Sequence, residues 1–183
     1  MAVAIKGELC AAIKDSLQAA CIDDIDPADT ALVGLVVLGR YASSVTVKKI
    51  VIEVHPQHPL GPEKEERKSS QAEKQQDGYE WNLPPETIGG ARFRWIRGTV
   101  QIRYHLRMDR EEAVPLIQVV VERVKQALDN DVDLIGITDD FGNRVHALEV
   151  TDDYSYTNDA GDPATERVFV DWRALVSSRR TRA

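Results

Sequence analysis

Residues 96–107 read Ile-Arg-Gly-Thr-Val-Gln-Ile-Arg-Tyr-His-Leu-Arg, and their side chains alternate in character. One parity is mainly apolar: Ile96, Val100, Ile102, Tyr104 and Leu106. The other parity is polar or basic: Arg97, Thr99, Gln101, Arg103, His105 and Arg107. A period of two is typical of a β-strand with one face on the core and the other in solvent. We therefore predict a half-buried strand with a cationic outer face.

The beginning of this strand does not follow the same alternation. Phe93 and Trp95 fall on the parity opposite to the later apolar residues. Either a bulge near Gly98 or a second apolar surface at the start of the strand would reconcile the two patterns. The sequence leaves both interpretations open.

Two amphipathic helices are expected on either side of this strand. Apolar residues recur at helical spacing over 5–20, and the aspartates and proline at 23–27 end that helix. A second helix is predicted over 109–128, with a capping pair of Asp109 and Glu112. Pro115 is unfavourable inside a helix, so we expect the regular part to begin near Val114.

The remaining elements read as strands over 31–38, 45–54, 134–138, 144–156 and 166–176. The first of these is nearly all apolar and needs cover on both faces. In the last, alternate residues share one apolar face: Val168, Val170, Trp172, Ala174 and Val176. The order predicts a single α+β domain over 1–183, an antiparallel β-sheet packed against two main helices.

Residues 55–90 interrupt this pattern, since they contain almost nothing to bury. A polar connection of this length inside a compact domain is usually functional or disordered. We interpret it as a long inserted loop or arm that becomes ordered against partners.

Composition narrows the function classes. Hydrophobic residues make up 43% and charged residues 29%, as in soluble globular proteins, and no apolar run is long enough to span a bilayer. The net charge of −7 argues against general DNA binding, which depends on neutralising phosphates. Cys10 and Cys21 are too few for a disulfide framework or a zinc site, and we expect buried free thiols.

Candidate chemistry is sparse. His55 and His58 lie in a proline-rich stretch rather than on a helix, so we expect a surface loop rather than a metal site. The aspartates at 129, 131 and 133 lack the glycine and closing glutamate of a calcium loop, and Asp139 with Asp140 suits a hairpin turn. No nucleophile motif or phosphate-binding loop is present. We expect no catalytic, metal or cofactor site, and hence no enzyme.

Residues 86–104, Glu-Thr-Ile-Gly-Gly-Ala-Arg-Phe-Arg-Trp-Ile-Arg-Gly-Thr-Val-Gln-Ile-Arg-Tyr, are followed by Asp-Arg-Glu-Glu-Ala at 109–113. This combination resembles the centre of bacteriophage tail terminator and related neck proteins. The strands at 134–138 and 168–176 are similar to the closing meander of that family. The resemblance extends over most of the chain except residues 55–85.

The resemblance implies a virion protein, made in the host cytoplasm, that forms a homo-oligomeric ring, expected to be sixfold. Such a ring ends polymerisation of the tail tube, binds the tube protein and the head connector, and lets DNA pass without reading it. Our candidates for the subunit interface combine arginines with aromatic residues: Arg94, Trp95, Arg97, Arg103, Arg107, Tyr79 and Trp81.

Two alternatives stay open. One is another neck or tail-completion protein of the same fold. The other, from a different class, is a small cytosolic ligand-binding or enzymatic module, for which His105 or His146 beside carboxylates in a deep pocket would be the sign.

Overall fold

The computed structural model describes residues 4–23, 32–41, 50–57, 91–104, 110–157 and 166–179. The predicted interface residues Tyr79, Trp81 and Arg107 lie outside the described residues. The predicted arm over 55–90 also lies outside them, except for its first three residues.

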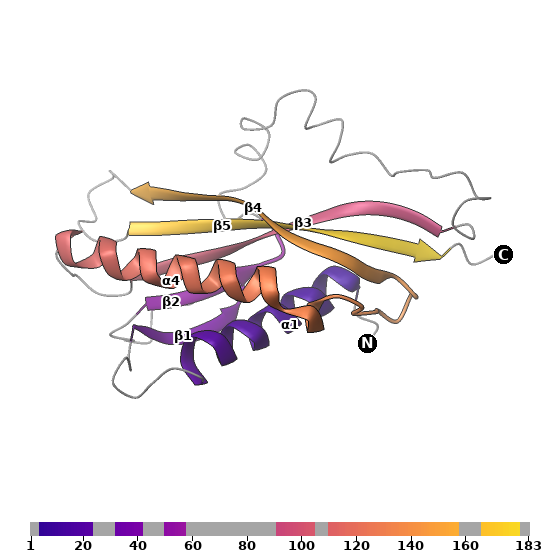
Figure 1. Cartoon of the computed structure of the whole chain (residues 1–183), viewed down its shortest axis with the longest axis horizontal. Helices are drawn as coiled ribbons and strands as arrows, with labels where there is room; N and C mark the ends of the chain where they lie inside the picture. Colours follow the sequence, from indigo (N-terminus) through magenta and orange to yellow (C-terminus); the bar gives the residue numbers. More distant parts are fainter. Residues whose placement is uncertain are drawn as a thin grey trace, which may run out of the picture.

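Five strands form one sheet (Figure 1). They are β1 (Val33–Leu38), β2 (Ile50–His55), β3 (Ala91–Tyr104), β4 (Arg144–Thr157) and β5 (Glu166–Arg179). Their order in the sheet is β1-β2-β3-β5-β4, so the strand that comes last in the sequence lies between β3 and β4. β1 is parallel to β2, whereas the other neighbours are antiparallel.

Both main helices lie on the same face of this sheet (Figure 1). α1 (Ile5–Gln18) continues into a π-helical turn, η1 (Ala19–Asp23), and α4 (Arg110–Asn130) is the longer helix. The predicted α+β fold, a sheet packed against two helices, is confirmed. The parallel β1–β2 pair makes the sheet mixed rather than wholly antiparallel.

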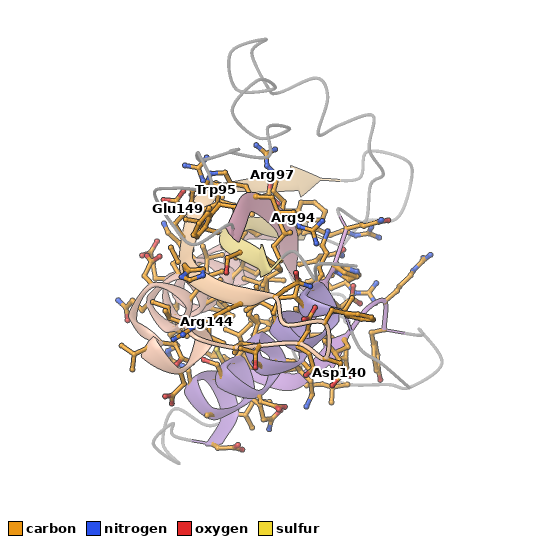
Figure 2. The ribbon with its side chains drawn as sticks, turned by 90° about the vertical axis from the view of Figure 1, so that its right-hand side faces the viewer. Arg94, Trp95, Arg97, Asp140, Arg144 and Glu149 are labelled. Carbon is orange, nitrogen blue, oxygen red and sulfur yellow. The ribbon has the colours of Figure 1, made fainter. Side chains whose placement is uncertain are left out.

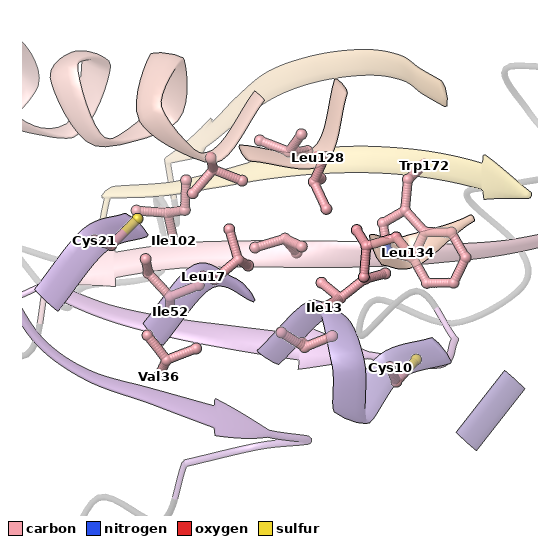
Figure 3. Packing of buried hydrophobic residues seen from close by; sticks show 14 of the residues in the cluster. Cys10, Ile13, Leu17, Cys21, Val36, Ile52, Ile102, Leu128, Leu134 and Trp172 are labelled. Carbon is pink, nitrogen blue, oxygen red and sulfur yellow. The ribbon is translucent and has the colours of Figure 1, made fainter. Parts of the chain in front are cut away.

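The core lies between the helices and the sheet (Figure 3). Ile13 and Leu17 of α1 meet Ile52 of β2 and Ile102 of β3, and all four are fully buried. The predicted apolar face of the last strand is confirmed, because its five alternate residues from Val168 to Val176 are all buried. Cys10 and Cys21 are buried free thiols, as expected, and burial raises the pKa of each to about 11.

α4 begins at Arg110 and runs through Pro115, so the expected start near Val114 is wrong. The amide groups of a helix's first turn have no intrahelical partner. Pro115 lies just beyond that turn, so its missing N–H removes little of the helix's backbone hydrogen bonding. The buried residues Ile117, Val120 and Val124 hold the helix on the sheet.

The predicted strand at 134–138 is also wrong. Residues Val132–Leu134 form a 3-10 turn, η3, whose N-cap Asp131 accepts a hydrogen bond from the amide of Asp133. Gly136 then takes φ +98°, and Thr138 pairs only through an isolated bridge to Arg144. The alternating apolar residues therefore follow a tight turn rather than an extended strand.

Asp139 joins the start of β4 to the start of α1. Its carboxylate accepts hydrogen bonds from the amides of Ile5, Phe141 and Asn143, at 2.8, 3.0 and 2.8 Å, and from the side-chain amide of Asn143 at 2.7 Å. The N-cap residue of α1 is Ala4, whose side chain cannot accept a hydrogen bond from the amides of the first turn. The carboxylate of Asp139, which is distant in the sequence, accepts the amide of Ile5 instead.

β3 pairs with β5 without interruption from Ala91–Arg179 to Arg103–Arg167. The interpretation of a bulge near Gly98 is therefore wrong, and Phe93 and Trp95 lie on the sheet face opposite the helices.

In the part of the chain that the structure describes, no helix is long and apolar enough to cross a membrane.

Candidate functional site: an arginine surface on the sheet

Three charged side chains form a row across the strands on the face opposite the helices. Arg97 of β3 is directly opposite Arg173 of β5, and Arg173 is directly opposite Glu149 of β4. Like charges opposite each other destabilise a sheet, whereas opposite charges stabilise it. The ion pair between Arg173 and Glu149 therefore offsets the repulsion between Arg97 and Arg173.

Trp95 joins this row through Arg173. The guanidinium of Arg173 lies over the Trp95 ring, with its central carbon 4.5 Å from the ring centroid. A cation at this distance is attracted by the negative face of the ring. Arg173 is thus held on one side by an indole and on the other by a carboxylate, and its plane is fixed by both.

Phe93 continues the same face toward the start of β3. Its ring lies 5.2 Å from the imidazole of His146, centroid to centroid, and His146 Nε2 is 2.6 Å from the hydroxyl of Ser177. Desolvation, and then the charge of Arg144, lower the pKa of His146. His146 is exposed and pairs with a hydroxyl, so it does not lie in the deep pocket beside carboxylates that we named as the sign of a ligand-binding or enzymatic module.

Two further arginines lie at this end of the sheet, where Figure 2 shows it end on. Arg94 of β3 and Arg144 at the start of β4 are both exposed. Arg94 is directly opposite the buried Val176, so its side chain lies on the helix side of the sheet, and Arg144 reaches toward Gly136. We call the set on the face opposite the helices the arginine surface: Trp95, Arg97, Arg173 and Glu149. Arginine and tryptophan side chains are the ones most enriched at the centres of protein interfaces.

The other half of β3 corrects the prediction of a cationic outer face. Thr99 is 1%, Gln101 3% and Arg103 7% exposed, although all three are on the face opposite the helices. Thr99 donates a hydrogen bond to Asp171 at 2.7 Å. The predicted interface residue Arg103 is therefore buried within its own chain, unlike Arg94.

Arg103 belongs to a buried network around Glu53 of β2. One carboxylate oxygen of Glu53 lies 2.6 Å from the guanidinium of Arg103 and accepts the amide of Tyr41 at 2.9 Å. The other lies 3.1 Å from His55 Nε2. Arg103 also donates to the carbonyl of Tyr41 at 2.9 Å.

This network sets the ionisation of Glu53. Burial by itself would raise the pKa of Glu53, but the hydrogen bonds from His55 and Tyr41 and the charge of Arg103 together hold the pKa below its usual range. Glu53 is therefore a buried carboxylate kept ionised. His55, expected on a surface loop, is the last residue of β2 and only 7% exposed.

The aspartates considered as metal ligands form hydrogen bonds to nearby backbone amides. Asp131 caps η3, and Asp139 organises the turn into β4. Among the described residues, no three His, Cys, Asp or Glu side chains are grouped so as to hold a metal ion.

The sequence prediction included Trp95 and Arg97 of the arginine surface but not Arg173 or Glu149, and the structure places the predicted Arg94 on the other side of the sheet. A signal for Arg173 was present, since it alternates with the apolar face of 168–176 and so belongs to the opposite face. Glu149 carried no such signal, because its place beside Arg173 depends on the register between β4 and β5.

Comparison with models of known protein families gave no match for this chain, and comparison with curated proteins gave none either.

Proposed function

We propose that this chain is a structural subunit that assembles with copies of itself into a ring, as a tail terminator or neck protein of a long-tailed bacteriophage. The support comes from two sources. One is the resemblance of residues 86–104 and 109–113 to that family. The other is the arginine surface, which has the composition of an interface rather than of a catalytic site.

The arginine surface is the observation that carries the proposal. Trp95 is only half-buried, and the guanidinium over its ring is itself fixed by Glu149. A rigid aromatic and arginine platform loses little side-chain entropy when a partner covers it. Such a platform suits a protein whose role is to bind other subunits.

In this proposal the ring ends the growth of the tail tube and gives the head connector a surface to bind. The tube protein and the connector are its partners, and DNA passes through the lumen. The formal net charge of −7 disfavours tight contact between the ring and that DNA.

The test is the mass of the purified protein by light scattering, together with negative-stain images of the same sample. We expect closed rings of a single size. Replacement of Trp95 by alanine should shift the mass toward the monomer, whereas replacement of the exposed Val119 on α4 should not. A protein that stays monomeric at every concentration would contradict the proposal.

A further inference from the structure

An open groove lies where α1 passes the end of α4 (Figure 1). Its volume is about 580 Å³, and small side chains form much of its wall. These are Ala12 and Ser16 of α1, Ala19 and Ala20 of η1, and Ala127 of α4. The carboxylates of Asp15, Asp131 and Asp133 and the side chain of Leu134 also line it. We call it the acidic groove.

The acidic groove favours a basic partner. None of its described lining residues is basic, and among the described residues only one of its carboxylates, Asp15, forms an ion pair, with Lys14. The groove also lies at the C-terminal end of α4, a helix of 21 residues with no basic residue in its last turn. The carbonyls at that end of a helix carry partial negative charge, so carboxylates there are unfavourable and a cation is stabilising.

Exposed apolar side chains lie beside these carboxylates. Val132, between Asp131 and Asp133 in the sequence, is 75% exposed, and Ile135, next to Leu134, is 49% exposed. Two large aliphatic side chains so open to solvent at one groove are typical of a surface that a partner covers. The partner should therefore combine positive charge with aliphatic area.

Residues 179–183 of the same chain, Arg-Arg-Thr-Arg-Ala, have this chemistry. They follow directly on β5, whose pairing with β3 ends at Arg179, and none of them is acidic. A guanidinium binds a carboxylate through two parallel hydrogen bonds, while its aliphatic stem packs on apolar side chains. In an extended segment Arg180 and Arg182 project to the same side, about 7 Å apart, so two carboxylates can be bound at once.

We propose that residues 179–183 of one copy bind in the acidic groove of the next copy. This inference rests on the proposed ring and names one contact that builds it. Arg180 and Arg182 pair with carboxylates of the groove, and their aliphatic stems cover Val132 and Ile135. Each copy thus gives its segment to one neighbour and accepts the segment of another. A contact of this heterologous kind repeats from copy to copy and closes into a ring when the rotation allows it.

Charge reversal on each side tests the proposal. Variant one carries Arg180→Glu and Arg182→Glu. Variant two carries Asp15→Lys and Asp133→Lys, both at exposed positions. Each variant alone places like charges in contact, so its self-association, measured by light scattering, should weaken by roughly a hundredfold. A chain with all four substitutions restores opposite charges at every contact and should assemble again.

A labelled peptide of residues 177–183 tests the same contact without assembly. Its binding is measured by fluorescence anisotropy on variant one, whose own segment no longer competes for the groove. We expect saturable binding that is lost when Asp15→Lys and Asp133→Lys are added to that variant. A peptide that does not bind variant one would overturn the inference.

Controls separate this inference from the proposed function. Glu122→Lys on α4, with 60% of its side chain exposed, changes one charge outside the acidic groove and should assemble normally. Circular dichroism checks that each variant is folded. Wild-type rings with unchanged assembly of both variants would overturn the inference and leave the ring intact, whereas wild-type protein without any association would overturn both.

Binding of the segment in the groove of its own copy is the remaining outcome. If the peptide binds variant one while the rings of variants one and two equal those of the wild type, the segment does not join copies and the inference is wrong.

Discussion

Gly98 of β3 lies directly against the indole of Trp172 on the neighbouring strand β5. A Cβ atom at position 98 would come within 2.1 Å of Trp172 Cζ2 and 2.8 Å of the carbonyl oxygen of His55. Trp172 is fully buried, and its Nε1 has no hydrogen-bond partner among the residues that the structure describes. The largest core side chain therefore fits only because its cross-strand neighbour has none.

Gly98→Ala should destabilise the protein by about 3 kcal/mol, at the upper end of the cost of overpacking a core. The midpoint of urea denaturation measures this change. Trp172→Leu in the same chain removes the clashing ring atoms, so the alanine should cost much less in that background. Equal costs of Gly98→Ala in both backgrounds would contradict the contact.

Two glutamate–arginine pairs on one sheet face allow a matched comparison. Glu53 and Arg103 are 1% and 9% exposed at the side chain, whereas Glu149 and Arg173 are 45% and 29% exposed. Glu53→Gln leaves a buried arginine without its countercharge and should cost about 3–5 kcal/mol of unfolding free energy. Glu149→Gln should cost less than about 1 kcal/mol, because water screens the exposed pair. Similar costs for both would mean that burial does not govern the Glu53 network.

The stability of the protein should fall in acid because of Glu53. Its pKa in the folded state is lower than in the unfolded state, so the unfolded state binds the proton more readily. The resulting stabilisation is complete above the unfolded pKa of about 4.3, and it is lost as the pH falls through the lower folded pKa.

Urea titrations at a series of pH values measure this effect. Asp139, whose pKa is also lowered, contributes in the same direction, so Glu53→Gln should flatten the profile without removing its slope. An unchanged slope in Glu53→Gln would show that Glu53 does not contribute.

Cys10 and Cys21 should react with a thiol reagent only when the fold opens. They are 3% and 1% exposed, and burial raises the pKa of each to about 11, so the reactive thiolate is scarce at neutral pH. Native protein should react slowly and unfolded protein at once, with two equivalents. Single Cys→Ser variants assign each rate, and rapid reaction of either thiol in the native protein would contradict its burial.

The sequence predicted where the helices and strands lie better than it predicted which of their polar side chains are buried. Period-two alternation located β3 and β5, and helical spacing located α1 and α4, because each pattern is local. Burial of Gln101 and Arg103 was not predictable in this way, since alternation separates two faces but does not say whether the polar one is covered. Arg103 can be buried because Glu53, on another strand, neutralises it.

The arginine surface was predictable in part for the same reason. Trp95 and Arg97 stand close together in the sequence, whereas the contact of Trp95 with Arg173 and the pairing of Arg173 with Glu149 depend on the register between distant strands. The parallel pairing of β1 and β2 was missed because both strands are short and apolar, and such patterns carry no direction.

The position of β5 between β3 and β4 determines when the protein can fold during its synthesis. β5 is the last of the five strands to leave the ribosome, yet it forms the longest pairings in the sheet, on both of its sides. Until it emerges, β4 has no other strand of the described sheet to pair with, and the surface of β3 around Gly98 that Trp172 will cover stays open. A nascent chain stalled before residue 166 should thus bind chaperones and be cleaved by proteases, and protection should appear in one step once β5 is released.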